Sequence, residues 1–245
     1  MPQPASFWAE LPLGRGVAVL NRDANGLAGL YKPAGLLSLP NTPAEQGRSL
    51  LQANYRADEE CYEWAGGKLW LLNRLDSATS GVILVADSAA LAAVIREHFK
   101  RKQVHKLYQA LVFGRPARKE ETWIDRLAIE KKGGQIRTGA GHIPSESRMR
   151  VIKSFTGPGG APLALIQLEP RTGRSHQLRV QSAKRHLPIV GDQTYGDFGQ
   201  NRAFAKLTGE KRLFLHSRST QFNYSQAGKE HNFAAEAPLP REFHL

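Results

Sequence analysis

Short apolar segments separated by polar turns make up most of the chain, and this pattern favours strands over long helices. Residues 29–32 form an apolar run that Pro33 ends. Residues 69–72 and 81–85 are apolar runs too short for buried helices and rich in branched side chains. We expect all three segments to be strands. Residues 49–55, where a serine precedes two leucines, are expected to form a short capped helix.

The clearest helical pattern begins at Ser88. Four apolar residues then recur at helical spacing on one face, namely Leu91, Val94, Ile95 and Phe99. Basic residues at 100–102 suit the negative C-terminal end of the helix dipole. We therefore expect a helix from residue 88, and a second helix near Ser175.

Four more strand-like segments follow this helix, separated by Gly/Pro turns or basic loops. They are residues 106–112, 122–127, 147–152 and 163–168. Their succession favours an antiparallel sheet. Because the chain shows no internal repeat and no linker-like stretch, we expect residues 1–245 to form one mixed α/β domain of the α+β class.

Composition narrows the class of protein. Hydrophobic residues at 41% and charged residues at 23% are ordinary for a globular chain, which excludes wholesale disorder. No apolar run approaches the roughly 20 residues of a membrane-spanning helix, and the N-terminus lacks the pattern of a secretory signal. We therefore expect a cytoplasmic protein with no membrane partner. The single cysteine, Cys61, excludes an internal disulfide and a thiolate metal cluster.

The formal net charge of +12 is concentrated in the middle of the chain. Residues 96–218 hold 25 basic and 10 acidic side chains, whereas residues 1–95 hold 7 and 9. A polyanionic partner is expected, and interleaved aromatic residues favour nucleic acid over a membrane. A solvated basic surface is the alternative. The Gly-rich basic segment 131–143 is a hairpin or mobile loop that either contacts such a partner or is a plain surface loop.

A polar loop at residues 73–81 (NRLDSATSG) lies between two expected strands, where rigid flanks can hold functional side chains. Asp76 could act there as a nucleophile or general base. A turn aspartate that bonds its own backbone is the structural alternative. Hydrolysis by Ser77 or Ser80 is a further option, although the chain has no Gly-x-Ser-x-Gly elbow.

Residues 171–179 (RTGRSHQLR) combine three arginines with a histidine and a glutamine at an expected helix start. Guanidinium groups bind phosphates and carboxylates through two hydrogen bonds, so this segment could bind phosphate, pair with a catalytic aspartate, or do both. An ordinary surface helix start is the alternative. The histidine spacing indicates no metal site, and no glycine-rich loop indicates a nucleotide cofactor.

Taken together, these segments resemble the pseudouridine synthases of the RluA type. Residues 73–86 (NRLDSATSGVILVA) resemble that family's catalytic block, usually written H-R-L-D-x-x-T-S-G. The other matching segments are 32–35 (KPAG), 106–112 (KLYQALV), 171–196 (RTGRSHQLRVQSAKRHLPIVGDQTYG) and 213–216 (LFLH). The matching blocks occur in the family's order between residues 31 and 216.

The resemblance implies a mixed, largely antiparallel sheet with flanking helices and a central RNA-binding cleft. It also implies an enzyme that isomerises uridine to pseudouridine in structured ribosomal or transfer RNA. It makes Asp76 the catalytic carboxylate, Arg174 its partner and Tyr108 the platform beneath the uracil. The expected RNA-binding residues are Arg74, which helps hold the place of the flipped-out uridine, and Lys106, Arg171, His176, Gln177 and Arg179. No metal ion or cofactor is expected, since base isomerisation requires neither.

One residue departs from the family pattern, because Asn73 stands where the family usually has histidine. We expect an altered hydrogen bond at the loop rather than lost activity. No separate N-terminal RNA-binding domain is expected, so the synthase domain or a partner would recognise the RNA, and we expect a monomer. The alternative is a catalytically inactive RNA-binding protein of the same fold. The intact set of Arg74, Asp76, Tyr108 and Arg174 favours the enzyme.

Overall fold

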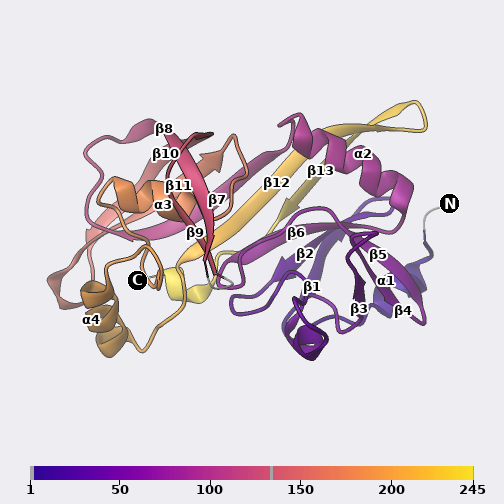
Figure 1. Ribbon diagram of the computed structural model, residues 1–245, viewed down its shortest axis with the longest axis horizontal. Coiled ribbons are helices and arrows are strands. Elements are labelled where there is room, and N and C mark those ends of the chain that lie inside the picture. Colours follow the sequence, from indigo (N-terminus) through magenta and orange to yellow (C-terminus); the bar gives the residue numbers. More distant parts are fainter. Residues whose placement is uncertain (1–2, 133–134, 245) are drawn as a thin grey trace. The chain divides into compact units, whose positions relative to one another are not determined.

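The computed structural model describes residues 3–132 and 135–244 (Figure 1). It divides the chain into two compact units, which are described one at a time. Unit 1 contains residues 1–105 and 217–238, and unit 2 contains residues 106–216 and 239–245. Strand β12 (Leu215–Gln226) begins in unit 2 and continues in unit 1. The prediction that residues 1–245 act as a single domain stays a prediction.

Unit 1 is built around an antiparallel sheet. Its elements are α1 (Ala5–Ala9), β1 (Ala18–Arg22), β2 (Leu27–Lys32), the 3-10 helix η1 (Pro43–Arg48), β3 (Asn54–Arg56), β4 (Cys61–Trp64), β5 (Gly67–Leu71), β6 (Ser80–Ala86), α2 (Ala89–Lys100), most of β12, and β13 (Lys229–Glu236). Strands β3, β4, β5 and β6 follow one another in the sheet, β2 also pairs with β6, and β13 pairs with β12. The three strands expected from the apolar runs of this unit are β2, β5 and β6, so these predictions are confirmed.

Strand β6 is the centre of unit 1, because apolar layers cover both of its faces. Ile83 and Val85 pack in one cluster with Leu30, Leu50 and Tyr62. The alternate residues pack in the other cluster, which includes Val82, Leu84 and Ala86 of β6, Leu91 and Ile95 of α2, and Phe222 of β12. A strand that is buried on both faces has no polar side chains to alternate with apolar ones, which explains its continuous apolar sequence.

The expected helix at residues 49–55 is wrong. This segment has isolated β-bridges at Ser49 and Leu51, bends at residues 50, 52 and 53, and then enters β3, and the short helix η1 precedes it instead. Leu50 and Leu51 are both fully buried, although they are adjacent. Backbone hydrogen bonds from Gly14 N to the Leu50 carbonyl (2.9 Å) and from Gln52 N to the Pro12 carbonyl (2.7 Å) hold the segment against the chain near residue 13. These long-range contacts override the local helix signal.

Helix α2 confirms the clearest helical prediction. The Ser88 hydroxyl caps its N-terminus by accepting a hydrogen bond from Leu91 N at 3.3 Å. Leu91, Ala92 and Ile95 are fully buried against the sheet of unit 1. The helical spacing of apolar residues therefore identified the buried face correctly.

Unit 2 contains a second set of antiparallel strands. Its elements are β7 (His105–Phe113), β8 (Glu120–Lys132), β9 (Gln135–Ala140), β10 (Ile143–Thr156), the 3-10 helix η2 (Pro158–Gly160), β11 (Pro162–Pro170), α3 (Gln177–Lys184), α4 (Phe198–Thr208) and the 3-10 helix η3 (Arg241–Phe243). The strand order is β7-β11-β10-β8-β9, and these neighbouring strands all pair antiparallel. The predicted antiparallel sheet is thereby confirmed.

The remaining predictions for unit 2 have mixed outcomes. The basic segment 131–143 contains β9, which pairs with β8 as a hairpin, while residues 133–134 lie outside the described residues. The helix expected near Ser175 is α3, which begins at Gln177. Helix α4 was not predicted from the sequence. Its signals were an Asp197 N-cap and a Gly209 in left-handed conformation after its end.

Substitution of Gly81, the second residue of β6, tests the close packing at that point. Its φ of +118° suits only glycine, and an added Cβ would lie 2.1 Å from the Ser217 carbonyl oxygen. We expect Gly81→Ala to cost more in free energy of unfolding than the roughly 1–3 kcal/mol of backbone strain alone. Urea unfolding measures this cost.

The matched control is Gly209→Ala, where φ is +79° but open space surrounds the added methyl group. This variant should cost only the left-handed strain of about 1–2 kcal/mol. Equal costs for the two variants would show that the close approach at Gly81 contributes nothing.

Candidate active site

The loop that carries Asp76 starts with a side chain that extends the sheet of unit 1. After the last β5–β6 pair, Leu72 N donates to the Leu84 carbonyl at 3.0 Å. The Asn73 side-chain oxygen then accepts a hydrogen bond from Leu84 N at 2.7 Å. In a continued antiparallel pair, Leu84 N would donate to the Leu72 carbonyl. Here the Asn73 side chain supplies the acceptor instead, and it holds the start of the loop on β6.

The residue immediately before Asp76 is clamped by a buried serine. Leu75 N donates to the Ser38 hydroxyl oxygen at 3.0 Å, and that hydroxyl donates to the Leu75 carbonyl at 2.7 Å. Tyr62 in turn donates its hydroxyl proton to the Ser38 carbonyl at 2.8 Å. Burial raises the pKa of Tyr62, so the tyrosine keeps the proton that it donates. These contacts fix the backbone on the N-terminal side of Asp76.

The residue immediately after Asp76 is held by the buried ammonium group of Lys32. Its Nζ donates to the carbonyls of Leu36 (2.6 Å), Pro33 (3.0 Å) and Ser77 (3.1 Å), and the side chain is fully buried. The Ser77 carbonyl also accepts a hydrogen bond from Gly35 N at 2.7 Å. Residues 32–35 therefore form the base on which the Asp76 loop rests.

The Asp76 side chain projects from a backbone that is fixed on both sides. It is half-buried, whereas Arg74 and Ser77 are exposed and Ser80 is fully buried at the start of β6. The turn closes with a hydrogen bond from Thr79 N to the Asp76 carbonyl at 3.0 Å. Such a loop can present one carboxylate at a defined position, which is what catalysis by a single carboxylate requires.

In unit 2, strand β7 presents Lys106 and Tyr108 on the same face, because side chains two residues apart on a strand point the same way. Both side chains are half-buried, and Tyr108 lies opposite Leu168 of β11. A Cβ added to Gly173 would lie 3.6 Å from Lys106 Nζ, so the arginine-bearing turn at 171–176 passes close to this lysine. Burial lowers the pKa of Lys106.

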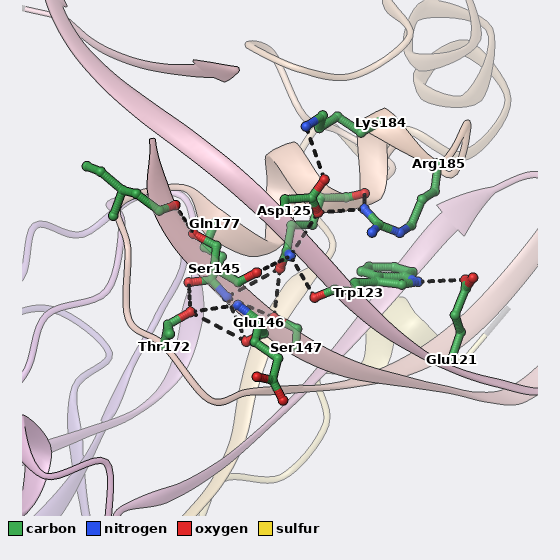
Figure 2. A network of polar contacts seen from close by, with 12 residues as sticks. Glu121, Trp123, Asp125, Ser145, Glu146, Ser147, Thr172, Gln177, Lys184 and Arg185 are labelled. Carbon is green, nitrogen blue, oxygen red and sulfur yellow. Dashed lines mark hydrogen bonds and ion pairs between the residues drawn. The ribbon is translucent and has the colours of Figure 1, made fainter. Parts of the chain in front are cut away.

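Gln177 holds the arginine-bearing turn in place (Figure 2). Its side-chain oxygen accepts hydrogen bonds from the Thr172 hydroxyl (2.7 Å) and from Arg174 N (3.1 Å). Its side-chain nitrogen donates to the Glu146 carbonyl (3.0 Å) and to the Ser147 hydroxyl (2.9 Å). Gln177 is only 3% exposed. The amide therefore ties the backbone of Arg174 to strand β10 and leaves the Arg174 side chain exposed.

A second polar cluster fixes the other end of α3 on β8, as Figure 2 also shows. Asp125 accepts hydrogen bonds from Arg185 (2.8 Å) and Lys184 (3.0 Å), and the Arg185 guanidinium lies 4.9 Å from the Trp123 ring centre. Burial by itself would raise the pKa of Asp125, but these hydrogen bonds and that of Gln181 bring it below its usual value. Helix α3 is thus anchored at both ends.

A buried ion pair joins α3 to the segment that follows it. Arg179 donates two hydrogen bonds to Asp192, from Nε to Oδ2 at 2.8 Å and from Nη2 to Oδ1 at 2.7 Å. Backbone N–H groups of Thr194 and Tyr195 also donate to Oδ1. Burial alone would raise the pKa of Asp192, but the guanidinium and these donors lower it below its usual value. The aspartate is therefore ionised inside the protein.

Tyr195 closes this network at the start of α3. Its hydroxyl lies 2.9 Å from Nδ1 of His176, and the Arg179 guanidinium lies 5.2 Å from its ring centre. His176 itself adopts a left-handed backbone conformation with φ of 54°. Side-chain contacts therefore connect residues 171–179 with residues 192–195 in unit 2.

The predicted site residues differ in how the structure places them. Arg74, Arg171 and Arg174 are exposed, and Arg171 forms an ion pair with Glu146 at 3.3 Å. Gln177 and Arg179 are buried. Their hydrogen-bonding groups hold the turn and the Asp192 segment, and the expected RNA contact by these two side chains stays a prediction.

Sequence reasoning gave no supporting role to four residues, namely Lys32, Ser38, Asp192 and Tyr195, although all but Ser38 lie in the matching segments 32–35 and 171–196. One signal for Lys32 was present: it is a lysine at the end of an otherwise apolar strand, where burial requires partners. Within residues 3–132 and 135–244, no group of three His, Cys, Asp or Glu side chains could hold a metal ion. Among the helices of the same described ranges, none is long and apolar enough to cross a membrane.

A comparison of the sequence with models of known protein families identifies the family of this chain. The model of the family described as RNA pseudouridylate synthase matches residues 27–184, which include the Asp76 loop, β7 and α3. The chain therefore belongs to the RNA pseudouridylate synthase family. The resemblance predicted from the sequence blocks is confirmed.

Individual relatives show how far the similarity extends. The chain is 33% identical over 177 residues to ribosomal large subunit pseudouridine synthase C of Vibrio cholerae, a match that covers 72% of this chain and 53% of that protein. It thus spans about half the length of that relative. It is 30% identical over 215 residues to tRNA pseudouridine synthase C of Haemophilus ducreyi, covering 84% of this chain and 85% of that one.

Solved structures show the same fold. Human RNA pseudouridylate synthase domain containing 1 aligns with a TM-score of 0.66 at 21% identity, covering 98% of this chain and 88% of that chain. Human RNA pseudouridylate synthase domain containing 4 aligns with a TM-score of 0.65 at 24% identity, covering 93% and 90%. The predicted mixed α/β fold with a largely antiparallel sheet is confirmed.

The Lys32→Met variant tests the support beneath the Asp76 loop. It keeps the length of the side chain but leaves the carbonyls of Pro33, Leu36 and Ser77 without this donor. Because an unsatisfied buried acceptor costs about 1–3 kcal/mol, we expect the free energy of unfolding to fall by at least about 2 kcal/mol in urea titrations.

The control is Lys68→Met, which removes a partly exposed ammonium group that contacts Glu59 at 2.9 Å. Pairs near the surface contribute about 0–1 kcal/mol, so this change should be small. A loss for Lys32→Met no larger than that of the control would contradict the anchoring role.

The ion pair between Arg179 and Asp192 predicts a specific dependence of stability on pH. Because the folded pKa of Asp192 lies below its unfolded value, the pair stabilises the protein above the ordinary carboxyl pKa. This contribution is lost as the pH falls through the folded pKa. Asp192→Asn should lower the melting temperature at pH 7 and flatten its decline in acid, as followed by thermal unfolding at several pH values.

The same carboxylate-to-amide change at Asp197 serves as the control, since asparagine also caps helices well. Asp197→Asn should leave stability at pH 7 nearly unchanged. The ion-pair interpretation fails if Asp192→Asn behaves like this control at pH 7.

Proposed function

We propose that this chain isomerises uridine to pseudouridine in ribosomal or transfer RNA, with Asp76 as the catalytic carboxylate. The observation that carries the proposal is the double anchoring of the Asp76 loop, by Ser38 on Leu75 and by Lys32 on Ser77. Rigid backbone on both sides of a half-buried carboxylate suits a group that acts on a positioned substrate. Membership of the pseudouridylate synthase family supports the same reaction.

The reaction balances without an outside reactant. The N1–C1′ bond of uridine breaks, the C5–C1′ bond forms, a proton leaves C5, and N1 of the product carries a proton. A carboxylate serves this sequence either as a nucleophile or as the base that accepts the C5 proton. No electrons are gained or lost, so the proposal includes no redox cofactor.

The other residues take the roles that the family resemblance implies. Tyr108 supports the uracil ring, Arg74 helps hold the place of the flipped-out nucleotide, and Arg174 is the partner of the Asp76 carboxylate. An exposed Arg174 side chain on a backbone fixed by Gln177 supports this role. Exposed Arg171 and half-buried Lys106 and His176 are proposed to contact RNA.

RNA as the partner is supported by the charge distribution, with 25 basic and 10 acidic side chains in residues 96–218. The ribosomal and transfer RNA classes are those in the names of the relatives. We also propose that the chain acts as a cytoplasmic monomer, with one synthase domain and no metal ion.

The Asp76→Asn variant tests the catalytic assignment directly. It removes the negative charge with little change of shape, so isomerisation should be abolished while the Kd for RNA stays within a few fold. Release of tritium from RNA labelled at C5 of uridine measures turnover, and fluorescence anisotropy measures binding. Full turnover by this variant would refute the assignment. RNA binding without turnover by the unaltered chain would favour the catalytically inactive RNA-binding alternative.

The companion variants concern Arg174. Lysine lacks the planar two-pronged geometry of a guanidinium, so Arg174→Lys should reduce turnover strongly and Arg174→Ala should reduce it further. A double-mutant cycle with Asp76→Asn, read on RNA affinity and melting temperature, should be non-additive. Strictly additive effects would leave Arg174 as a phosphate contact.

A further inference from the structure

Helix α4 presents an exposed ridge that the proposed chemistry does not use. Phe198, Arg202 and Lys206 are four residues apart, so they lie in a row along one side of the helix. All three are exposed, whereas Asn201 and Phe204 face the interior of unit 2. We call these three residues the α4 ridge.

Phe198 is unusual among the side chains of this surface. Four large apolar side chains are exposed within the described residues, and Phe198, at 50% exposure, is the only aromatic one. The packing of α4 comes instead from Phe204, whose ring lies 6.1 Å from that of Phe113 and 5.5 Å from that of Phe214. The helix therefore has a buried anchor, and the outward position of Phe198 is not explained by packing.

Leu207, the other exposed apolar residue of α4, has a structural explanation. A Cβ added to Gly159 would lie 2.7 Å from its Cδ1 atom, so Leu207 covers the glycine turn at η2. No ring contact of Phe198 is found within the part of the chain that the structure describes. An exposed aromatic ring without such a packing role is available for a ligand.

The charge on α4 is entirely positive. Residues 198–208 contain Arg202 and Lys206 and no acidic residue. The nearby Asp197 carboxylate is engaged as the N-cap, where it accepts hydrogen bonds from Gln200 N and Gln200 Nε2, both at 2.9 Å. Within the described residues, neither cation of the ridge forms an ion pair with a carboxylate. An anionic ligand is therefore favoured.

We propose that the α4 ridge is a further RNA-binding site, which binds single-stranded nucleotides of the RNA outside the target uridine. Phe198 stacks on a base, and Arg202 and Lys206 bind backbone phosphates. The choice of RNA as the ligand rests on the proposed function. One ring beside two cations suits a nucleotide chain better than a protein partner, which would require a much larger apolar surface. The ridge lies beyond residues 27–184, by which the family is recognised.

Anisotropy titrations of the full chain with a labelled single-stranded oligouridine of about ten nucleotides test this site. Phe198→Ala should raise the Kd at least about fivefold, since stacking on an aromatic ring contributes that much or more. Phe198→Tyr keeps the aromatic face and should bind like the unaltered chain. Combined Arg202→Gln and Lys206→Gln should reduce the slope of log affinity against log salt by about 1.4, the value for two phosphate contacts on a single strand.

The matched control is Ile124→Ala, which removes an even more exposed apolar side chain (73%) from β8 of the same unit and should leave the Kd unchanged. Thermal unfolding establishes that each variant is folded. Unchanged affinity of Phe198→Ala, or an unchanged salt slope of the double glutamine variant, would overturn the proposal. So would full affinity of Phe198→Leu, because leucine offers an apolar contact but no stacking.

Turnover of the unaltered chain separates this proposal from the proposed function. If the chain isomerises uridine but the ridge variants bind oligouridine normally, the ridge proposal fails and the function stands. If the ridge variants lose affinity although the unaltered chain shows no turnover, the ridge proposal stands and the isomerase assignment fails.

Discussion

The buried ammonium group of Lys32 is the interaction on which the Asp76 loop depends most. A charged group that is fully removed from water must be surrounded by acceptors, and here backbone carbonyls provide them. Because one of those carbonyls belongs to Ser77, satisfying the lysine also positions the residue after Asp76. If the loop moved away, the buried charge of Lys32 would lose one of its acceptors, so the energetic cost of burying that charge favours the observed position of the loop. Unit 2 uses the same principle at the Arg179–Asp192 pair and at Gln177, whose buried polar groups hold the turn that carries an exposed arginine.

The parts of the fold that the sequence predicted were those decided by local pattern. Strand β6 was recognisable because both of its faces are buried, and α2 because its apolar residues follow the helical period and a serine caps it. The helix expected at residues 49–55 failed because Leu50 and Leu51 are held by backbone contacts with a segment almost forty residues earlier. Helix α4 escaped notice because it buries only two residues, one of them an asparagine, and so has a weak apolar period.

The candidate site divides in a similar way. The family blocks pointed to Asp76, Tyr108 and Arg174. The side chains of these residues are exposed or half-buried, as their proposed roles require. The blocks could not distinguish a polar side chain that contacts RNA from one that holds the protein together. Gln177 and Arg179 belong to the same block as Arg174, yet hydrogen bonds to partners 13 to 31 residues away bury them. Such partners become visible only when the chain is folded.

The route of the chain between the units has a consequence for the order of biosynthesis. Residues 217–238 belong to unit 1, although all of residues 106–216 are synthesised before them. Gly81, the second residue of the strand after the Asp76 loop, is packed against Ser217. A ribosome therefore releases nearly the whole strongly basic middle of the protein before the first unit can acquire its last two strands. Until then the nascent chain carries most of its positive charge, while the strand that packs against Gly81 beside the Asp76 loop is still missing. The basic segment is therefore synthesised before unit 1 can complete its fold.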